Sequence, residues 1–389
     1  MNFLTQLAAV TVMGMRAIPQ RLGASVVIVI GMACVVAVTI SILSLSIGFM
    51  RAVTSTARPD QAIVLSQGSL VEGESAIPRG SVLTIIDAPG VKRDVDGRPL
   101  ASAEFFINVP VPKKRDGLNV YIGLRGIGPK FLKLHPDIRL ISGRLFVPGH
   151  RELIVGKAAE EQFAGLEVGN HILLPAGAWT VTGIYDSHGD MFDSELLGDA
   201  ETVIPALRYN VFSAVWVLLG RPDAFAQFKH ALTTNPTLGV DVMTGTEYWQ
   251  SISKDLTPIL TMVAYVVGGI MGLGAIFAAL NTMYTVVSTR SVEIATLRAI
   301  GFDGRVVITS VLMESLSLAL VGAVIGAGIA WFAFNDAPHV AGQIVISLTV
   351  TPALMGRGIV YACALGFIGG LLPAIRAATV PVTSGLRAT

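Results

Sequence analysis

Four long apolar runs constrain this chain more than any other feature of its sequence. A helix of roughly 20 apolar residues crosses a bilayer, and runs of about this length or longer, without any Asp, Glu, Lys or Arg, lie at 22–50, 256–289, 315–335 and 358–375. Only 14% of all residues are charged, against about 25% in soluble proteins. We therefore predict an α-helical polytopic membrane protein with four transmembrane helices, at 22–50, 256–289, 306–335 and 358–376.

The placement of arginines sets the orientation of these helices. The short segments before the first helix, between the second and third, and after the fourth carry Arg16, Arg21, Arg290, Arg298, Arg305, Arg376 and Arg387. By the positive-inside rule these segments are cytoplasmic. Residues 51–255 and the short loop 336–357 then lie on the outer side of a bacterial inner membrane. The first apolar run is too long for a signal peptide, so we expect it to remain as a membrane helix.

Residues 51–255 are numerous enough to form a domain with its own core. Strand-like runs, rich in β-branched and aromatic residues, lie at 118–127, 151–156, 171–185 (with a hairpin turn at Ala176-Gly177) and 213–220. Helical spacing is found at 81–87, 157–163, 223–232 and 246–256. We predict a mixed α+β periplasmic domain between the first and second transmembrane helices. The last of its helices should continue into the second span as a stalk.

The two ends of the chain and its cysteines belong with the membrane part. We expect residues 1–21 to form an amphipathic helix in the cytoplasmic interface and residues 377–389 to form a cytoplasmic tail. Cys34 and Cys363 both lie in apolar runs. We interpret both as small hydrophobic residues that form no disulfide in the outer domain.

Small and ionisable residues within the spans suggest how the helices pack. Gly322 with Gly326, and Gly366 with Gly370, stand at four-residue spacing, which favours close approach of membrane helices. Glu314 lies near the start of the third span. A carboxylate there must face protein or water, or lie at the headgroup boundary; we favour the headgroup boundary.

No enzymatic signature is found. The sequence has no G-x-x-x-x-G-K-[ST], H-E-x-x-H, C-x-x-C or G-x-S-x-G motif, so we expect a non-catalytic chain without a cofactor or metal. A net charge of +1 provides no basic surface for nucleic acid. Residues 185–195 hold the nearest polar cluster, formed by Asp186, His188, Asp190, Asp193 and Glu195. Such side chains can bind a metal, but we favour a solvated loop between two strands.

Residues 289–301, TRSVEIATLRAIG, form a short charged segment between the second and third apolar runs. Their composition predicts a helix, which Gly301 ends with a left-handed cap, and Asp303-Gly304 then turns the chain into the third span. The apolar residues do not form one clean stripe, so we expect this helix to be covered on several sides, by lipid headgroups and by a protein partner.

Each kind of side chain in this helix has an expected place. We expect the apolar side chain of Leu297 to lie inside the partner. The charges of Arg290 and Glu293 should pair at the exposed rim of that contact, where an ion pair contributes little.

These segments resemble a known family. The stretches EIATLRAIG, ESLSLALVGAVIG and GGLLPAIRAATVPVTSGLRA, together with ISGRLF, RELIVGK and LEVGNHILLPAGAWTVTGIY in the outer domain, are similar to permeases of the FtsX/MacB/LolC-type (type VII) ABC transporters. The resemblance covers essentially the whole chain. It implies four spans, a large periplasmic domain, a stalk formed by the second helix, and a dimer of permeases. It also implies that residues 290–305 form a coupling helix that docks onto an ABC ATPase.

The resemblance carries a site over to this chain, with two departures. The ATPase-coupling residues it implies are Arg290, Glu293, Thr296, Leu297, Arg298, Ala299 and Gly301. MacB has an ATPase domain fused before its first span, whereas about twenty residues precede the first span here, so we expect ATP and Mg²⁺ on a separate ATPase subunit. The C-terminal VTSGLRAT differs from the family's more acidic I-E-A-L-R pattern, which puts a docking role for the tail in doubt.

The implied function is that of a permease subunit which couples ATP hydrolysis by its partner to movement of its periplasmic domain. Because the spans are nearly free of charge, we favour such mechanotransmission, for export or extraction of a substrate, over a polar channel. A periplasmic adaptor protein is a further possible partner. Two alternatives stay open: an ABC-type regulator that activates a periplasmic enzyme without transport, and a membrane-anchored ligand-binding sensor.

Overall fold

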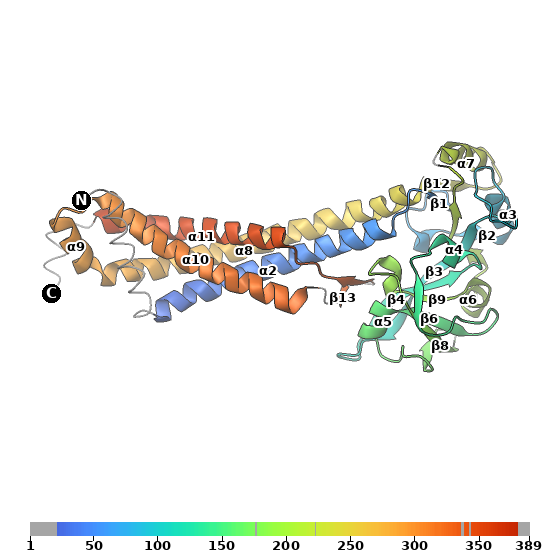
Figure 1. Cartoon of the computed structure of the whole chain (residues 1–389), viewed down its shortest axis with the longest axis horizontal. Coiled ribbons are helices and arrows are strands. Elements are labelled where there is room, and N and C mark those ends of the chain that lie inside the picture. The colour runs from blue at the N-terminus through green and yellow to red at the C-terminus, as the bar shows by residue number, and fades with distance from the viewer. Residues whose placement is uncertain (1–21, 176, 222, 336–337, 342–343, 380–389) are drawn as a thin grey trace. The chain divides into compact units, whose positions relative to one another are not determined.

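The computed structural model describes residues 22–379 except 176, 222, 336–337 and 342–343. The expected interfacial helix at 1–21 and the tail beyond residue 379 lie outside the described residues. The chain divides into two compact units, one of Met1–Ser46, Ile259–Asp336 and Thr349–Thr389, the other of Ile47–Pro258 and Ala337–Leu348. We call the first the membrane unit and the second the inserted domain (Figure 1).

In the described part of the chain, four helices are long and apolar enough to cross a membrane. They are α2 (Leu22–Thr56), α8 (Gly245–Thr289), α10 (Gly304–Phe334) and α11 (Pro352–Thr379). The predicted four-span architecture, with an α+β domain between the first two spans, is therefore confirmed. Both α2 and α8 run past the boundary between the units, so their residues belong to both. The helix α11 begins before residue 358, where the sequence places the fourth span.

The four glycines at four-residue spacing pack helices within this chain. A Cβ at Gly322 would meet the carbonyl oxygen of Val29 in α2 at 2.6 Å, and one at Gly326 would meet Cα of Ala33 at 2.9 Å. At Gly366 and Gly370 of α11 a Cβ would meet the side chains of Ala319 and Ser315 in α10, at 2.5 and 2.7 Å. Because the glycines carry no side chain, the helices approach more closely than larger residues would allow.

Polar side chains add hydrogen bonds to this packing. Ser315 Oγ donates to the carbonyl of Gly366 at 2.7 Å, and Tyr361 Oη donates to the carbonyl of Gly268 at 2.9 Å. Cys34 and Cys363 are free thiols.

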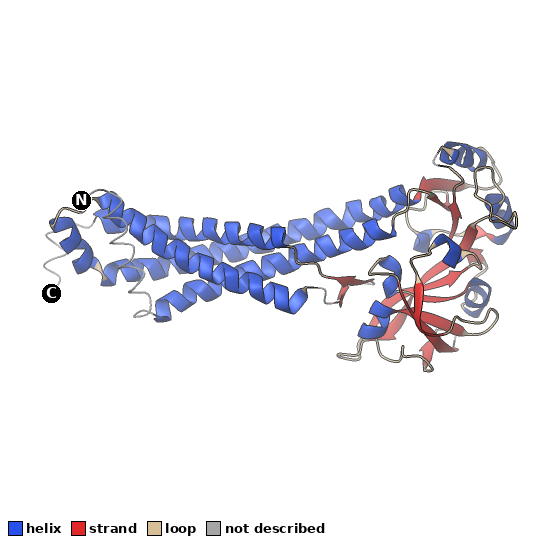
Figure 2. Cartoon of the chain, viewed as in Figure 1, coloured by secondary structure: helices blue, strands red, loops and turns tan. Residues whose placement is uncertain are grey.

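A large sheet forms the centre of the inserted domain (Figure 2). Among the described residues it has ten strands, in the order β12-β1-β11-β3-β4-β9-β6-β8-β5, with β7 paired to β8. Two pairs of neighbouring strands, β4–β9 and β6–β8, are parallel, and the other pairs are antiparallel. The strands are β1 (Gln61–Ser66), β3 (Ala101–Pro112), β4 (Asn119–Ile127), β5 (Arg139–Gly143), β6 (Glu152–Gly156), β7 (His171–Leu174), β8 (Gly177–Asp186), β9 (Leu196–Asp199), β11 (Ala214–Leu218) and β12 (Val240–Thr244).

Short helices and a small hairpin complete the inserted domain. The strands β2 (Ile77–Pro78) and β10 (Val211–Phe212) pair with each other. The helices are η2 (Glu72–Glu74), α3 (Arg79–Ile86), α4 (Phe131–Leu134), α5 (Lys157–Gln162), η3 (Met191–Ser194), α6 (Ala200–Ala206) and α7 (Ala224–Thr233).

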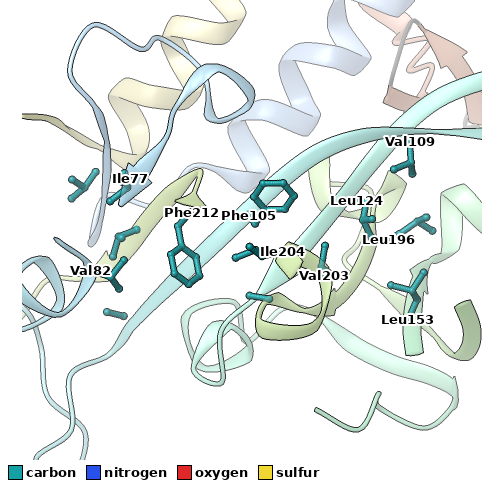
Figure 3. Close-up of a cluster of buried hydrophobic side chains, with 14 of the residues drawn as sticks. Ile77, Val82, Phe105, Val109, Leu124, Leu153, Leu196, Val203, Ile204 and Phe212 are labelled. Carbon is teal, nitrogen blue, oxygen red and sulfur yellow. The ribbon is translucent and has the colours of Figure 1, made fainter. Parts of the chain in front are cut away.

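The core of the inserted domain lies against this sheet (Figure 3). Leu124 of β4, Leu153 of β6 and Leu196 of β9 lie together within it, and Val203 and Ile204 join them from α6. The four strand-like runs of the sequence correspond to β4, β6, β7 with β8, and β11. The antiparallel pairing of β7 with β8 also agrees with the expected hairpin.

The loop between the third and fourth spans contains a structure that the sequence did not predict. Strands β13 (Pro338–Ala341) and β14 (Ile344–Ser347) pair antiparallel. This hairpin belongs to the inserted domain rather than to the membrane unit. From the sequence we expected only a short loop at 336–357 and did not predict this hairpin.

The glycine packing leads to a prediction on α10. Gly326→Ala should lower the unfolding temperature of the detergent-solubilised chain, because the new Cβ would overlap the backbone of α2 at Ala33. Gly328→Ala is the matched control, since nothing lies within 4 Å of a Cβ there. It should leave the unfolding temperature unchanged or raise it, because alanine favours helix by up to about 1 kcal/mol over glycine. Equal effects of the two substitutions in thermal unfolding would contradict the close packing.

Candidate functional site

The charged segment between the second and third spans forms a separate short helix. The helix α8 ends at Thr289, Arg290 leaves the helical conformation with φ −104° and ψ 10°, and α9 runs from Ser291 to Ala299. Gly301 has φ 100°, so the predicted left-handed cap is confirmed. The amides of Gly301 and Phe302 donate to the carbonyls of Arg298 and Leu297, the pattern of a Schellman cap.

Asp303 then starts the third span. Its side chain accepts a hydrogen bond from the amide of Arg305 at 3.1 Å, and the helix α10 begins at Gly304. This N-cap satisfies an amide that has no partner within its own helix. Caps at both ends of the 300–304 turn therefore fix where α9 stops and α10 starts.

Arg290 is buried beneath α9. Only 7% of its surface is exposed, whereas the sequence placed this residue at an exposed rim, which is wrong. Its Nη1 donates to Glu314 Oε2 at 3.2 Å, and its Nε donates to Glu293 Oε2 at 3.1 Å. The guanidinium thus joins the break before α9 to the first half of α10.

Glu314 faces protein rather than the headgroup boundary that we favoured. It is 5% exposed and pairs with Arg290 inside the membrane unit. A carboxylate in this position is stable only if a cation and hydrogen bonds replace its hydration. The pair therefore fixes α9 against α10, while the backbone of α9 also lies beside α11.

One face of α9 is exposed. Ile300, just after the helix, is 68% exposed, and the exposed residues from 291 to 301 are Val292, Glu293, Thr296, Ala299, Ile300 and Gly301. The residues from 292 to 300 recur at one-, three- and four-residue steps, so they share one side of the helix. We call them the α9 face.

The seven residues that the family resemblance implied therefore divide into two groups. Glu293, Thr296, Ala299 and Gly301 are exposed on or beside the α9 face. Arg290 is buried, Leu297 is half-buried at the border of the α9 face, and Arg298 is half-buried on the opposite side. The sequence missed Val292 and Ile300, the large apolar residues of the α9 face. A helical wheel centred on Thr296, with Ile294 placed inward, would have found them.

A second set of polar residues is buried in the inserted domain, and of these only Glu195 was singled out from the sequence. Arg125 of β4 is 1% exposed. All five N–H groups of its guanidinium donate to carboxylates, at 2.7 to 3.0 Å, and these belong to Glu72, Glu104 and Glu195. Trp216 Nε1 also donates to Glu72 at 2.8 Å. We call Arg125 and its three carboxylates the Arg125 cluster.

Aromatic rings enclose this cluster. The guanidinium carbon lies 4.9 Å from the ring centre of Phe106 and 5.1 Å from that of Phe192. This arrangement excludes water, which raises the pKa of Glu104 to about 8 because burial penalises the carboxylate form. Burial beside Arg125 lowers the pKa of His135 to about 3, so that imidazole is neutral near pH 7.

The acidic segment 185–195 contributes to the Arg125 cluster, and only His188 and Gly189 within it are exposed, so the solvated loop that we favoured is wrong for residues 191–195. Met191, Phe192, Asp193 and Ser194 form η3 and are all buried, and Glu195 pairs with Arg125. Among the residues that the structure describes, no group of three or more His, Cys, Asp or Glu side chains is placed to hold a metal.

Comparison with known proteins covers both units. Residues 25–235 match the family described as MacB-like periplasmic core domain, and residues 265–382 match the family described as FtsX-like permease C-terminal. The chain is 30% identical over 146 residues to the uncharacterized ABC transporter permease YknZ of Bacillus subtilis. It is 27% identical over 141 residues to the permease YvrN of the same organism. These matches span 38% and 36% of this chain but only 36% and 34% of the relatives.

Solved structures also show limited likeness. The extracellular domain of the noncanonic ABC-type transporter YknZ from Gram-positive bacteria has a TM-score of 0.37 at 17% identity, covering 47% of this chain and 99% of that one. The periplasmic region of MacB from Actinobacillus actinomycetemcomitans has a TM-score of 0.39 at 11% identity, covering 52% and 97%. The sequence matches, rather than these likenesses, identify the relatives.

The buried pair beneath α9 predicts a strong effect of Arg290. Arg290→Met should destabilise the detergent-solubilised chain by about 3–5 kcal/mol, because it removes the buried cation that pairs with the Glu314 carboxylate. Adding Glu314→Gln should restore most of the loss, since the double variant no longer buries that carboxylate. Arg305→Met, at an exposed position near the same turn, is the control. An Arg290→Met protein as stable as this control would show that the pair contributes nothing.

The Arg125 cluster predicts a pH dependence of folding. The pKa of Glu104 is about 8 in the folded chain against an ordinary 4.5, so between these values the folded state holds a proton that the unfolded state releases. The free energy of unfolding should therefore fall as pH rises through this window. Glu104→Gln should remove that part of the fall, visible as a smaller loss of melting temperature between pH about 6.5 and about 8.5.

Two comparisons isolate the contribution of Glu104. His135 affects stability below pH 6.5 and so does not contribute above it. Its neutral form is favoured by folding, so stability is lost as pH falls from 6.5 towards its folded pKa of about 3. Glu161→Gln, at an exposed position, should leave the slope of melting temperature against pH unchanged. If Glu104→Gln and Glu161→Gln gave the same slope, Glu104 would not be protonated in the folded chain.

Proposed function

The chain belongs to the ABC transporter permeases of the FtsX/MacB type, and on that premise we propose that it is the subunit that couples a separate ABC ATPase to movement of the inserted domain. The ATPase would bind on the cytoplasmic side at α9. The inserted domain would lie on the outer side of a bacterial inner membrane and drive export or extraction of a substrate there.

The α9 face is the observation that carries this proposal. It presents Val292 and Ile300 to solvent beside the carboxylate of Glu293, an apolar surface with a charge at its edge. Such surfaces mark protein contacts, because exposed apolar side chains gain free energy when a partner removes them from water. The Arg290–Glu314 pair below it supports the assignment, since it would pass force from α9 directly to the third span.

Nucleotide binding is assigned to the partner. The sequence has no phosphate-cradling G-x-x-x-x-G-K-[ST] loop, the usual means by which ABC ATPases hold ATP and Mg²⁺. In this proposal the chain supplies no catalytic residue. Its contribution is a rigid docking surface and the helices that connect it to the inserted domain.

The continuity of α2 and α8 supports movement of the inserted domain rather than passage of a substrate through the membrane helices. Each helix contains residues of the membrane unit and of the inserted domain, so a helix displaced in the membrane would displace the domain as well. Few charges occur within the four spans, which disfavours a water-filled route for a polar substrate.

A second copy of the permease is the expected neighbour in the membrane. The helix α8 exposes a long apolar face that includes Ile270, Leu273 and Phe277. Asn281 is exposed as well, and its amide can both donate and accept, so the same residue of a second copy would satisfy it better than lipid. A periplasmic adaptor remains a further proposed partner on the outer side.

The coupling proposal is tested on the α9 face. Ile300→Asp should abolish stimulation of the co-purified ATPase, because docking would bury a carboxylate without a cation. Ile300→Val keeps an apolar side chain and should retain stimulation. Neither change should alter the unfolding temperature of the permease alone, since residue 300 is largely exposed. The measurement is ATP turnover of the complex in lipid nanodiscs, with co-purification of the ATPase as a second readout.

A contrary result has a clear form. If Ile300→Asp bound the ATPase and stimulated it as well as Ile300→Val does, α9 would be a simple connector between two spans. If no ATPase co-purified with the unmodified chain, the proposal would be overturned.

A further inference from the structure

The end of the first membrane helix is hydrogen-bonded to a short segment of the inserted domain, η3. The last residue of α2, Thr56, is buried, and its Oγ1 accepts a hydrogen bond from the amide of Met191 at 3.0 Å. The same hydroxyl donates to the carbonyl of Ala52 one turn earlier, at 2.7 Å. The end of α2 and the beginning of η3 are therefore joined through a single hydroxyl group.

The second membrane helix contacts the same segment. Trp249, in the second turn of α8, stands edge-on to Phe192 of η3 with 6.3 Å between ring centres. It also stacks on Trp216 at 6.3 Å. Its neighbour Tyr248 accepts a hydrogen bond through its hydroxyl from the amide of Glu72 at 3.4 Å. The start of α8 is thus packed against η3 and against one carboxylate-bearing segment of the Arg125 cluster.

The loop between the third and fourth spans also reaches η3. The backbone of the β13–β14 hairpin lies against η3 and against α5. This hairpin follows α10 and precedes α11 in the chain. All three stretches of chain that lead between the membrane helices and the inserted domain therefore contact one four-residue segment.

The segment η3 is itself held firmly. Tyr185 Oη donates to the carbonyls of Phe192 at 2.6 Å and of Glu195 at 3.0 Å. The ring of Phe192 packs on the guanidinium of Arg125, and Glu195 accepts two hydrogen bonds from it. Because Arg125 lies on β4 and also binds carboxylates of η2 and β3, a displacement of η3 is passed to the sheet instead of being absorbed locally.

We propose that η3 and the Arg125 cluster form the junction through which movement of the membrane helices enters the inserted domain, with Thr56 and Trp249 as positioning residues. This inference rests on the proposed coupling function and adds the residues that would carry it. Short buried hydrogen bonds and ring contacts suit the role, because small shifts of packed elements are transmitted rather than dissipated.

The experiment uses the complete permease with its co-purified ATPase in nanodiscs. Cys34 and Cys363 are replaced by alanine, and spin labels are placed at Val95→Cys in the inserted domain and at Phe332→Cys in α10, both highly exposed positions. The distance between the labels is measured with and without a non-hydrolysed ATP analogue and Mg²⁺. We expect Thr56→Val to lose most of the nucleotide-dependent change in distance, while ATP binding by the partner is kept.

Matched variants separate coupling from folding. Thr56→Ser keeps the hydroxyl and should keep the distance change. Thr54→Val is the control on the same helix, because Thr54 is exposed and its hydroxyl donates only to the carbonyl of Met50. Trp249→Leu tests the contact from α8 independently of Thr56, and Tyr121→Phe, at an exposed tyrosine of β4, is its control. All variants are first compared by unfolding temperature.

The possible results discriminate between the two proposals. A distance change that persists in folded Thr56→Val and Trp249→Leu proteins would overturn the junction alone and leave the coupling function intact. Loss of the change in Thr54→Val as well would also overturn it, since the effect would not be specific to η3. No nucleotide-dependent change in the unmodified protein would remove the coupling function and the junction with it.

Discussion

The inserted domain depends on one buried cation. Arg125 uses every N–H of its guanidinium on three carboxylates that come from η2, β3 and the residue just before β9. Removing so many charges from water is costly unless each is paired and hydrogen-bonded. The cluster therefore holds η2, β3 and the residue before β9 against β4, and the aromatic side chains of η3 and α8 complete the enclosure that keeps water out.

The membrane unit uses the same chemistry beside α9. Arg290 binds Glu314 of α10 and Glu293 of α9, so a single guanidinium joins the break after α8 to two helices. The planar, permanently charged fork of arginine suits both sites, since it can satisfy two or more carboxylates in a fixed geometry. A buried ion pair is weak evidence for stability as such. Here each pair fixes how separate segments lie against one another, which matters most where force is to be passed on.

These two sites stand at the two ends of the proposed coupling route. Movement would begin at the α9 face, where Ile300 and Val292 are exposed, and pass through the Arg290–Glu314 pair into the third span. It would enter the inserted domain at η3, where α2, α8 and the β13–β14 hairpin all make contact. Glycine contacts such as Gly326 with Ala33 keep the helices close, so that displacement of one is felt by its neighbours. The route needs no charged residue in the bilayer apart from the paired Glu314.

The sequence by itself determined the membrane architecture, because long runs without charge have one stable solution in a bilayer, a helix with its backbone hydrogen bonds satisfied internally. It also determined the cap at Gly301, since a left-handed residue favours glycine. Local patterns likewise indicated β4, β6, β8 and β11. Only the tertiary structure decided which charges are buried. Nothing near Arg125 in the sequence marks Glu72 or Glu195 as its partners, and Arg290 looks like any surface arginine until Glu314 is brought beside it. Ion pairs between residues so far apart in the sequence depend on how the chain folds back on itself, and local sequence patterns carry no information on that.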